Sequence, residues 1–129
     1  KIYNAVVIGK INESGTLIDK LLKDTKNNIV KVDDDGKESI LNYKLLKYKD
    51  NLSLVEIELL TGRSHQIRVQ MAHFNHPLYG DQKYNVNALI GQQIALFACR
   101  IEFEHPTTHK LLTFSLPLPD RVPFNVFDD

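Results

Sequence analysis

Over most of the chain, hydrophobic and polar residues alternate with a period of two, the pattern of β-strands that bury one face. The clearest example is LSLVEIELL at 52–60, where Val55, Ile57 and Leu59 alternate with the opposite set of positions. The Asp-Asn pair before it fits a tight hairpin with the preceding strand. β-Branched and aromatic residues predict further strands at residues 2–8, 27–32, 40–49, 94–104 and 111–118.

Four other segments are expected to interrupt the strands. TLIDKLLKD (16–24) is expected to form a short helix or a loop with apolar anchors. DDDGK (33–37) is expected to form a turn in which Gly36 can take positive φ. HPLYGDQKYN (76–85) has the composition of a loop, and the last eleven residues contain two prolines, which predicts an irregular tail.

One segment changes to the period of an α-helix. Ile67, Met71 and Phe74 follow one another at spacings of four and three, which places them on a single helical stripe. Ser64 is the expected N-cap residue, and Gly62 is the expected pivot between the preceding strand and the helix. The resulting layout is a strand-dominated α+β fold with one clear helix.

The end of this helix is expected at Asn75 or His76, before a proline. The expected N-cap at Ser64 puts Arg63 and His65 at the start of the helix and Arg68 one turn further along. These donor side chains interrupt a chain whose other polar residues are mostly lysines and acids. The change of character indicates a functional site.

Composition places the chain among soluble globular domains. It has 129 residues, 43% of them hydrophobic and 25% charged, which is enough for one domain with a real core. No apolar run is long enough to span a bilayer, and the chain begins with no recognisable signal peptide. The single cysteine, Cys99, has no disulfide or CxxC partner, so a reducing cytoplasm is the expected location.

The formal net charge is zero, which by itself gives no argument for a nucleic-acid partner. Residues 61–99 nevertheless hold Arg63, Arg68 and Lys83 against Asp81 alone. Arginine offers a planar fork that suits carboxylates, phosphates and base edges. From charge alone, either a chance excess or an anion-binding region explains this segment.

Three kinds of site are compatible with the helix start. A metal site at His65, His73 and His76 is disfavoured because no cysteine and few acidic residues accompany these histidines. A nucleophilic pair of Ser64 with its histidine neighbour lacks the flanking glycines of a nucleophile elbow. An anion site made by Arg63 and free N–H groups of the first turn is better supported, although this pattern is unspecific.

The segment TGRSHQIRVQMAHFNHPLYGDQKY (61–84) resembles the signature of the RluA-type pseudouridine synthases, which reads close to TGRxHQIRxH, GHP, GD and a tyrosine. The likeness continues in order along the chain. KIYNAVVIG is similar to the family's K-x-Y-x-A-x-V-x-G strand, SGTLIDKLLKD to its G-x-ID-x-L segment and DDDGKESILNYKLL to its GK hairpin. ALFACRIEFEHP and FSLPLPDRV resemble its last strands.

The resemblance implies that residues 1–129 are the C-terminal portion of a pseudouridine synthase catalytic domain, with a mixed, mainly antiparallel sheet and a flanking helix and loops. Gln70, Asn75 and Phe97 depart from the histidine, glycine and histidine usual at these positions. The family's nucleophilic aspartate, in an H-R-L-D-x-x-T-S-G segment, has no counterpart here. The chain alone is therefore expected to be inactive.

The resemblance also implies roles for individual residues. Tyr3 is the expected catalytic tyrosine against the uracil, and Arg68 the expected partner of the missing aspartate. Because an unpaired buried guanidinium is costly, Arg68 should be solvent-reachable or bound to an ion or another acid. Burial of Arg68 together with pairing inside the chain would count against its assignment. The implied substrate-binding residues are Arg63, His65, Gln66 and Leu96.

The implied activity is the isomerisation of uridine to pseudouridine in ribosomal or transfer RNA, with no metal or cofactor. The flipped base would be recognised by stacking and polar contacts. Two alternatives remain open at this point. One is a non-catalytic RNA-binding module on the same platform, and the other is a structural domain that has kept no site.

Overall fold

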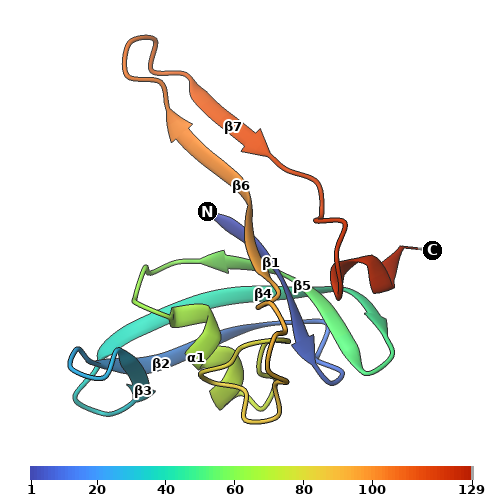
Figure 1. Ribbon diagram of the computed structural model, residues 1–129. Coiled ribbons are helices and arrows are strands. Elements are labelled where there is room, and N and C mark those ends of the chain that lie inside the picture. Colours follow the sequence, from blue (N-terminus) through green and yellow to red (C-terminus); the bar gives the residue numbers. More distant parts are fainter. Residues whose placement is uncertain (129) are drawn as a thin grey trace.

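A seven-stranded antiparallel sheet is the frame of the structure, a computed structural model that describes residues 1–128 (Figure 1). The order across the sheet is β3-β2-β4-β5-β1-β6-β7. The strands are β1 (Ile2–Ile8), β2 (Ser14–Asp24), β3 (Ile29–Val32), β4 (Lys37–Lys49), β5 (Leu52–Leu59), β6 (Leu96–Glu104) and β7 (Leu111–Ser115). The helices are α1 (Gln66–His73) and the short 3₁₀ helix η1 (Phe124–Phe127).

The α+β fold with a mainly antiparallel sheet is confirmed, and every strand pair among the described residues is antiparallel. The tight hairpin between β4 and β5 is confirmed as well. Asp50 and Asn51 both have positive φ, at 53° and 62°. Two left-handed residues in succession match the twist of the flanking strands, and Asp and Asn tolerate that conformation.

The two faces of the sheet bury different residues, as a period of two requires. On the face that α1 covers, Ala5 and Val7 pack with Val55 and Ile57 in the main core. On the opposite face Val6 packs in a second core with Leu54, Ala95, Phe124 and Phe127. The expectation of an irregular tail is therefore wrong for η1, whose two buried phenylalanines cover the back of the sheet.

Residues 16–24 belong to β2 and form neither a helix nor a loop, so that expectation is wrong. β2 pairs with β4 from Ser14 to Leu21 and then with β3. Leu17 and Leu21 are buried, whereas Ile18 is 60% exposed. A spacing of four residues places side chains on the same side of either a helix or a strand, so only the pairing with β4 decides between them.

Gly36 is needed for a different reason from the one expected. Its φ is not positive, but a Cβ built on it would lie 2.5 Å from the backbone carbonyl carbon of Leu21. The turn between β3 and β4 passes so close to β2 that no larger residue fits.

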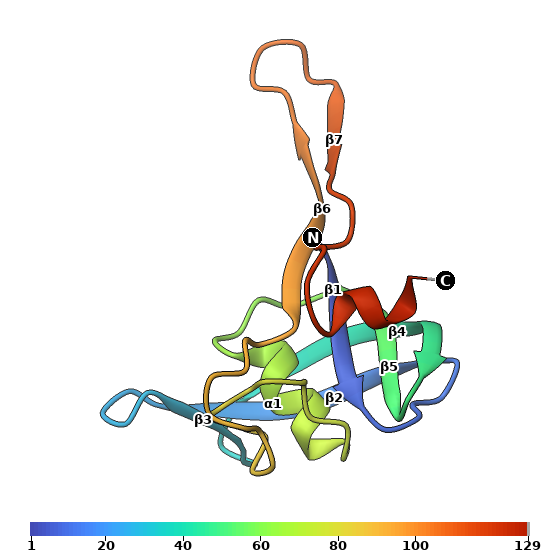
Figure 2. The same cartoon turned by 45° about the vertical axis from the view of Figure 1, so that its right-hand side comes forward.

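The β6–β7 hairpin projects from the body of the molecule in both views (Figures 1 and 2). β6 pairs with β1 only from Leu96 to Arg100, and beyond that point its partner is β7. The N-terminus lies beside the base of this hairpin (Figure 1). No helix within residues 1–128 is long and apolar enough to cross a membrane.

Candidate functional site

The turn that leads from β5 into α1 is built by a buried glutamine. His65 occupies the N-cap position with φ of 53° and makes no side-chain cap hydrogen bond, so the prediction of Ser64 as N-cap is wrong. Oε1 of Gln66 instead accepts hydrogen bonds from the Arg63 N–H at 2.9 Å and the Thr61 hydroxyl at 3.0 Å. One side-chain oxygen thus holds the turn that presents Arg63 and His65.

A pair of buried amides fixes the helix to the sheet. Gln66 is 2% exposed and Gln70 is fully buried. Nε2 of Gln66 donates to Oε1 of Gln70 at 2.9 Å and to the carbonyl of Ile40 at 3.1 Å. Nε2 of Gln70 in turn contacts Asp19 Oδ2 and the Ser39 carbonyl, both at 3.1 Å. Gln70, one of the three departures from the family pattern, therefore completes a hydrogen-bond network that a buried amide requires.

The other two departures also have a structural explanation. Asn75 takes φ of 66° just after the helix, where His76 N–H donates to the Met71 carbonyl and Asn75 N–H to that of Ala72. This is a Schellman cap, in which asparagine tolerates the left-handed conformation that usually calls for glycine. The Phe97 ring packs edge-on against η1, with its centroid 5.6 Å from that of Phe124.

A bidentate ion pair attaches the loop after the helix to α1. Arg68 Nη2 and Nε donate to Asp81 Oδ1 at 2.8 Å and Oδ2 at 3.0 Å. The side chain of Asp81 is fully buried, and that of Arg68 is 23% exposed. Arg68 is thus bound to another acid, as expected, and it is paired inside the chain without being buried. Its proposed catalytic role stays a prediction.

The electrostatics of this pair favour the charged form of both groups. Burial alone would raise the pKa of Asp81, but hydrogen bonds from Arg68 and from the Tyr84 and Lys83 N–H groups bring it below its ordinary value. The hydrogen bond to Asp81 raises the pKa of Arg68. A carboxylate held by a planar fork and two backbone donors is a rigid anchor for the loop.

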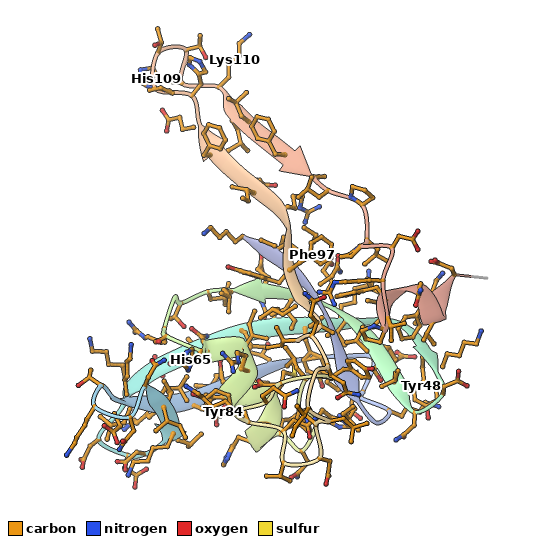
Figure 3. All side chains as sticks on the ribbon, in the orientation of Figure 1. Tyr48, His65, Tyr84, Phe97, His109 and Lys110 are labelled. Carbon is orange, nitrogen blue, oxygen red and sulfur yellow. The ribbon has the colours of Figure 1, made fainter. Side chains whose placement is uncertain are left out.

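Tyr84 links the same loop to the helix start and to β3. Its hydroxyl oxygen lies 2.6 Å from His65 Nδ1 and accepts the Val30 N–H at 2.9 Å. The Arg68 guanidinium lies 5.0 Å from the centre of the Tyr84 ring. Figure 3 shows His65 at the start of α1 with Tyr84 close to it. The two rings and the guanidinium form one packed wall.

The surroundings of His65 favour its neutral form. Burial is the largest cause that lowers its pKa, and the charges of Arg68, Lys83 and Lys23 lower it further, against the opposing effect of Asp81. No hydrogen bond joins Nε2 of His65 to another residue in the described part of the chain. A neutral imidazole with one free nitrogen can exchange a hydrogen bond with a ligand.

These residues surround a small open pocket of about 170 Å³ between α1 and the centre of the sheet. We call it the uridine pocket, after the nucleoside that the resemblance to the RluA-type synthases implies for it. Its lining contains all six residues that the sequence singled out, together with two apolar residues that were not: Tyr3, Arg63, His65, Gln66, Arg68 and Leu96, with Leu59 and Ile67.

Sheet order brings the most distant members of this pocket together. Tyr3 on β1 lies opposite Ala98 on β6, and Leu96 lies opposite Ala5. A bulge in β6 shifts the register between Ile2 and Tyr3, directly beside the pocket. The Tyr3 hydroxyl makes no hydrogen bond with another residue in 1–128. The ring therefore has its apolar side packed and its polar end free.

The side chain of Arg63 is exposed, but hydrogen bonds hold it in place. Its Nε and Nη2 donate to the Glu38 carbonyl at 3.3 and 3.0 Å. Nη1 makes no hydrogen bond within the described chain, so one edge of the guanidinium is available to a ligand. The amide of Gln66, by contrast, is fully used by the protein, which suits support of the turn better than contact with a substrate.

Asp81, Tyr84, Leu59 and Ile67 were not assigned a role from the sequence. Asp81 and Tyr84 lie in the GD-and-tyrosine part of the signature, so the resemblance contained a signal for them. The histidines form no cluster. Nδ1 of His76 lies 2.8 Å from the Ile8 carbonyl oxygen, His73 is exposed, and no group of three or more metal-ligating side chains occurs within residues 1–128.

A family model described as RNA pseudouridylate synthase matches residues 1–73. Ribosomal large subunit pseudouridine synthase D of Vibrio cholerae is 35% identical over 92% of this chain and 41% of its own length. The uncharacterized RNA pseudouridine synthase YlyB of Bacillus subtilis is 39% identical over 92% of this chain and 40% of its own length. The chain thus spans about two fifths of the length of these relatives.

Solved structures agree on the fold. Human RNA Pseudouridylate Synthase Domain Containing 1 superposes with a TM-score of 0.79 at 22% identity, over 91% of this chain and 54% of that one. Human RNA Pseudouridylate Synthase Domain Containing 4 gives a TM-score of 0.72 at 19% identity, over 93% and 58%. The match of the family model over residues 1–73, which includes Tyr3 and the helix start, shows that the chain belongs to the RNA pseudouridylate synthase family.

Proposed function

We propose that the protein isomerises uridine to pseudouridine in structured ribosomal or transfer RNA. In this proposal residues 1–129 are the C-terminal portion of the catalytic domain and supply one wall of the site. The observation that supports it is the uridine pocket, which is lined together by the residues for which the family resemblance implies a role.

The reaction needs no external oxidant or reductant. The N1–C1′ bond of uridine breaks, the uracil turns, and a C5–C1′ bond forms. C5 then loses its hydrogen and N1 gains one, so the product is an isomer of the substrate. The protein must therefore hold a detached base in place and move protons, which its own side chains can do without a metal or cofactor.

The pocket supplies an apolar and a polar side for such a base. Leu96 and Leu59 offer aliphatic surface to one face of the uracil, and the Tyr3 ring lies with them in the wall. Stacking of a base on an aromatic ring is worth about 1–3 kcal/mol, which offsets much of the cost of extruding a base. The free Tyr3 hydroxyl is the candidate for proton transfer.

The two arginines have different roles in this proposal. Arg63, anchored by the Glu38 carbonyl, holds a phosphate of the substrate with its free Nη1. Arg68 is oriented by Asp81, and its Nη1, which is unbonded within the described chain, receives the carboxylate of a nucleophilic aspartate from outside residues 1–129. Gln66 and His65 position this edge of the pocket.

A pocket of about 170 Å³ is small beside the roughly 300–1,000 Å³ of typical ligand sites. This fits one wall of a site whose other wall lies elsewhere. We therefore propose that the chain alone is inactive, and that the whole protein acts in the cytoplasm, where ribosomal and transfer RNA are accessible.

The test is release of tritium from unmodified ribosomal and transfer RNA labelled at uridine C5, since formation of the C5–C1′ bond displaces that hydrogen. The whole protein should release tritium and the chain alone should not, with the Vibrio cholerae relative as positive control. Tyr3→Phe in the whole protein should abolish release.

Release by the chain alone would mean that an acid within these residues does the chemistry. Absence of release by the whole protein on every RNA, while the control is active, would overturn the proposal in favour of a non-catalytic RNA-binding module.

A further inference from the structure

A second and larger cleft lies at the turn before α1 and shares Arg63 with the uridine pocket. It has a volume of about 420 Å³, within the range of ligand sites. Its walls come from the β2–β3 hairpin, the start of β4 and the turn, and include Leu21, Val30, Lys23, Lys37, Gly62 and Arg63. We call it the Gly62 cleft.

We propose that the Gly62 cleft is a second nucleotide subsite, which holds the nucleoside and phosphate adjacent to the uridine in the neighbouring pocket. This inference rests on the proposed function and deepens it. Arg63 lines both the cleft and the uridine pocket, so a ligand that fills both must pass along this side chain.

The charge of the cleft suits a phosphodiester. Lys23, Lys37 and Arg63 line it against one carboxylate, Asp35. In the part of the chain that the structure describes, no ion pair engages Lys23 or Lys37, and Arg63 has its Nη1 unbonded. Lys23 is also near enough to His65 for its charge to lower the pKa of that residue. Lys23, Lys37 and Arg63 thus place three cationic side chains along the cleft, and Arg63 continues into the uridine pocket.

Gly62 leaves the surface of the turn open at the cleft. Its φ is not positive, and a Cβ built on it would meet no described atom within 4 Å beyond its two neighbours in the chain. Gly36, on the opposite wall of the cleft, is required by the protein itself, because its Cβ would collide with the Leu21 backbone. A methyl group at position 62 would therefore project into open space, where a strand of RNA that crosses the turn closely would meet it.

The experiment compares two ligands on the ¹⁵N-labelled chain by amide chemical shifts. Uridine monophosphate should perturb amides of the uridine pocket, such as those of Tyr3 and Leu96. The trinucleotide ApUpA should perturb these and also amides of the Gly62 cleft, such as those of Leu22 and Gly36. ApUpA should bind about tenfold more tightly than uridine monophosphate, because a charge-assisted hydrogen bond contributes about this much to affinity.

Two sets of variants then test the cleft itself. Lys23→Ala with Lys37→Ala should weaken the binding of ApUpA about tenfold and flatten the dependence of its affinity on salt, but weaken the binding of uridine monophosphate by less than about twofold. A control with the same charge change is Lys10→Ala with Lys110→Ala, remote from the cleft, and it should change neither ligand. Lys110 lies at the outer tip of the β6–β7 hairpin (Figure 3).

Gly62→Ala should leave the melting temperature unchanged and weaken ApUpA several-fold, whereas Gly36→Ala should lower the melting temperature. ApUpA shifts confined to the uridine pocket, with no effect of the lysine variants, would overturn the second subsite and leave the proposed function standing. Shifts in the Gly62 cleft without any in the uridine pocket would also overturn it. If neither ligand perturbed the uridine pocket, the proposed function would fall together with this inference.

Discussion

The uridine pocket and the β6–β7 hairpin differ in what holds their residues in place. Around the pocket, polar side chains are buried and paired across elements: Gln66 and Gln70 bind β4 and β2, and Asp81 binds Arg68. On the hairpin, large apolar side chains are exposed, with Phe103 at 43% and Phe114 at 59%. These two rings stack on each other with centroids 5.5 Å apart.

This difference indicates which region is formed by the chain's own tertiary contacts. The pocket wall is stabilised by contacts between residues far apart in sequence, so its geometry is set before a ligand arrives. The outer hairpin is a two-stranded ribbon, and such ribbons are marginally stable by themselves. Its exposed apolar surface has the character of an interaction site. The following predictions, from the largest effect to the smallest, test this contrast.

Replacing Arg68 by alanine should have the largest effect on stability. Asp81 would remain fully buried without its counter-charge, and breaking such a pair costs about 3 kcal/mol, the low end of the range because Arg68 is partly exposed. Urea denaturation followed by circular dichroism measures the free energy of unfolding. Arg63→Ala is the matched control and should cost less than about 1 kcal/mol. Equal losses from both variants would contradict the view that the ion pair anchors the loop.

Gln70→Leu should destabilise the protein by about 2 kcal/mol. The leucine has a similar volume, but the Gln66 amide, Asp19 and the Ser39 carbonyl would lose a buried hydrogen-bond partner. The same denaturation measurement applies, with Gln93→Leu as an exposed control. A stabilised Gln70→Leu variant would mean that the amide network is not needed.

Phe114→Ser on the hairpin should change the free energy of global unfolding by no more than about 0.5 kcal/mol. It should instead reduce the protection of hairpin amides, because it removes the stacked pair with Phe103. Hydrogen exchange read residue by residue separates the two effects. Loss of protection in β1 or β5 would show that the hairpin and the body unfold as one unit.

The smallest expected effect is a pH dependence from His65. Its pKa in the folded protein lies below the unfolded value of about 6.5, so the folded state binds fewer protons between these two values. The contribution of His65 to the free energy of unfolding should therefore be constant above about pH 6.5 and should decrease as the pH falls below that value. His65→Gln should remove this component, and His73→Gln should not. An unchanged profile for His65→Gln would contradict the assignment.

The local pattern predicted the strands well where alternation and turn residues agreed. β4, β5 and their hairpin follow from the period of two and from Asp50 and Asn51. β2 was missed because the spacing of Leu17 and Leu21 suits a helix as well as a strand. The prediction of Ser64 as N-cap was wrong because Gln66, which is hydrogen-bonded to the sheet, accepts the hydrogen bonds of the turn instead.

By itself, the sequence predicted the family, the strand-rich fold and six residues that line one pocket in the structure. It did not determine that Arg68 would be held by Asp81, that Tyr84 would join His65, or that a second cleft would open beside Gly62. These depend on residues brought together by strand order, as when β1 and β6 place Tyr3 near Leu96. Periodicity records which face a residue buries, whereas partners distant in the chain are chosen only when the sheet assembles.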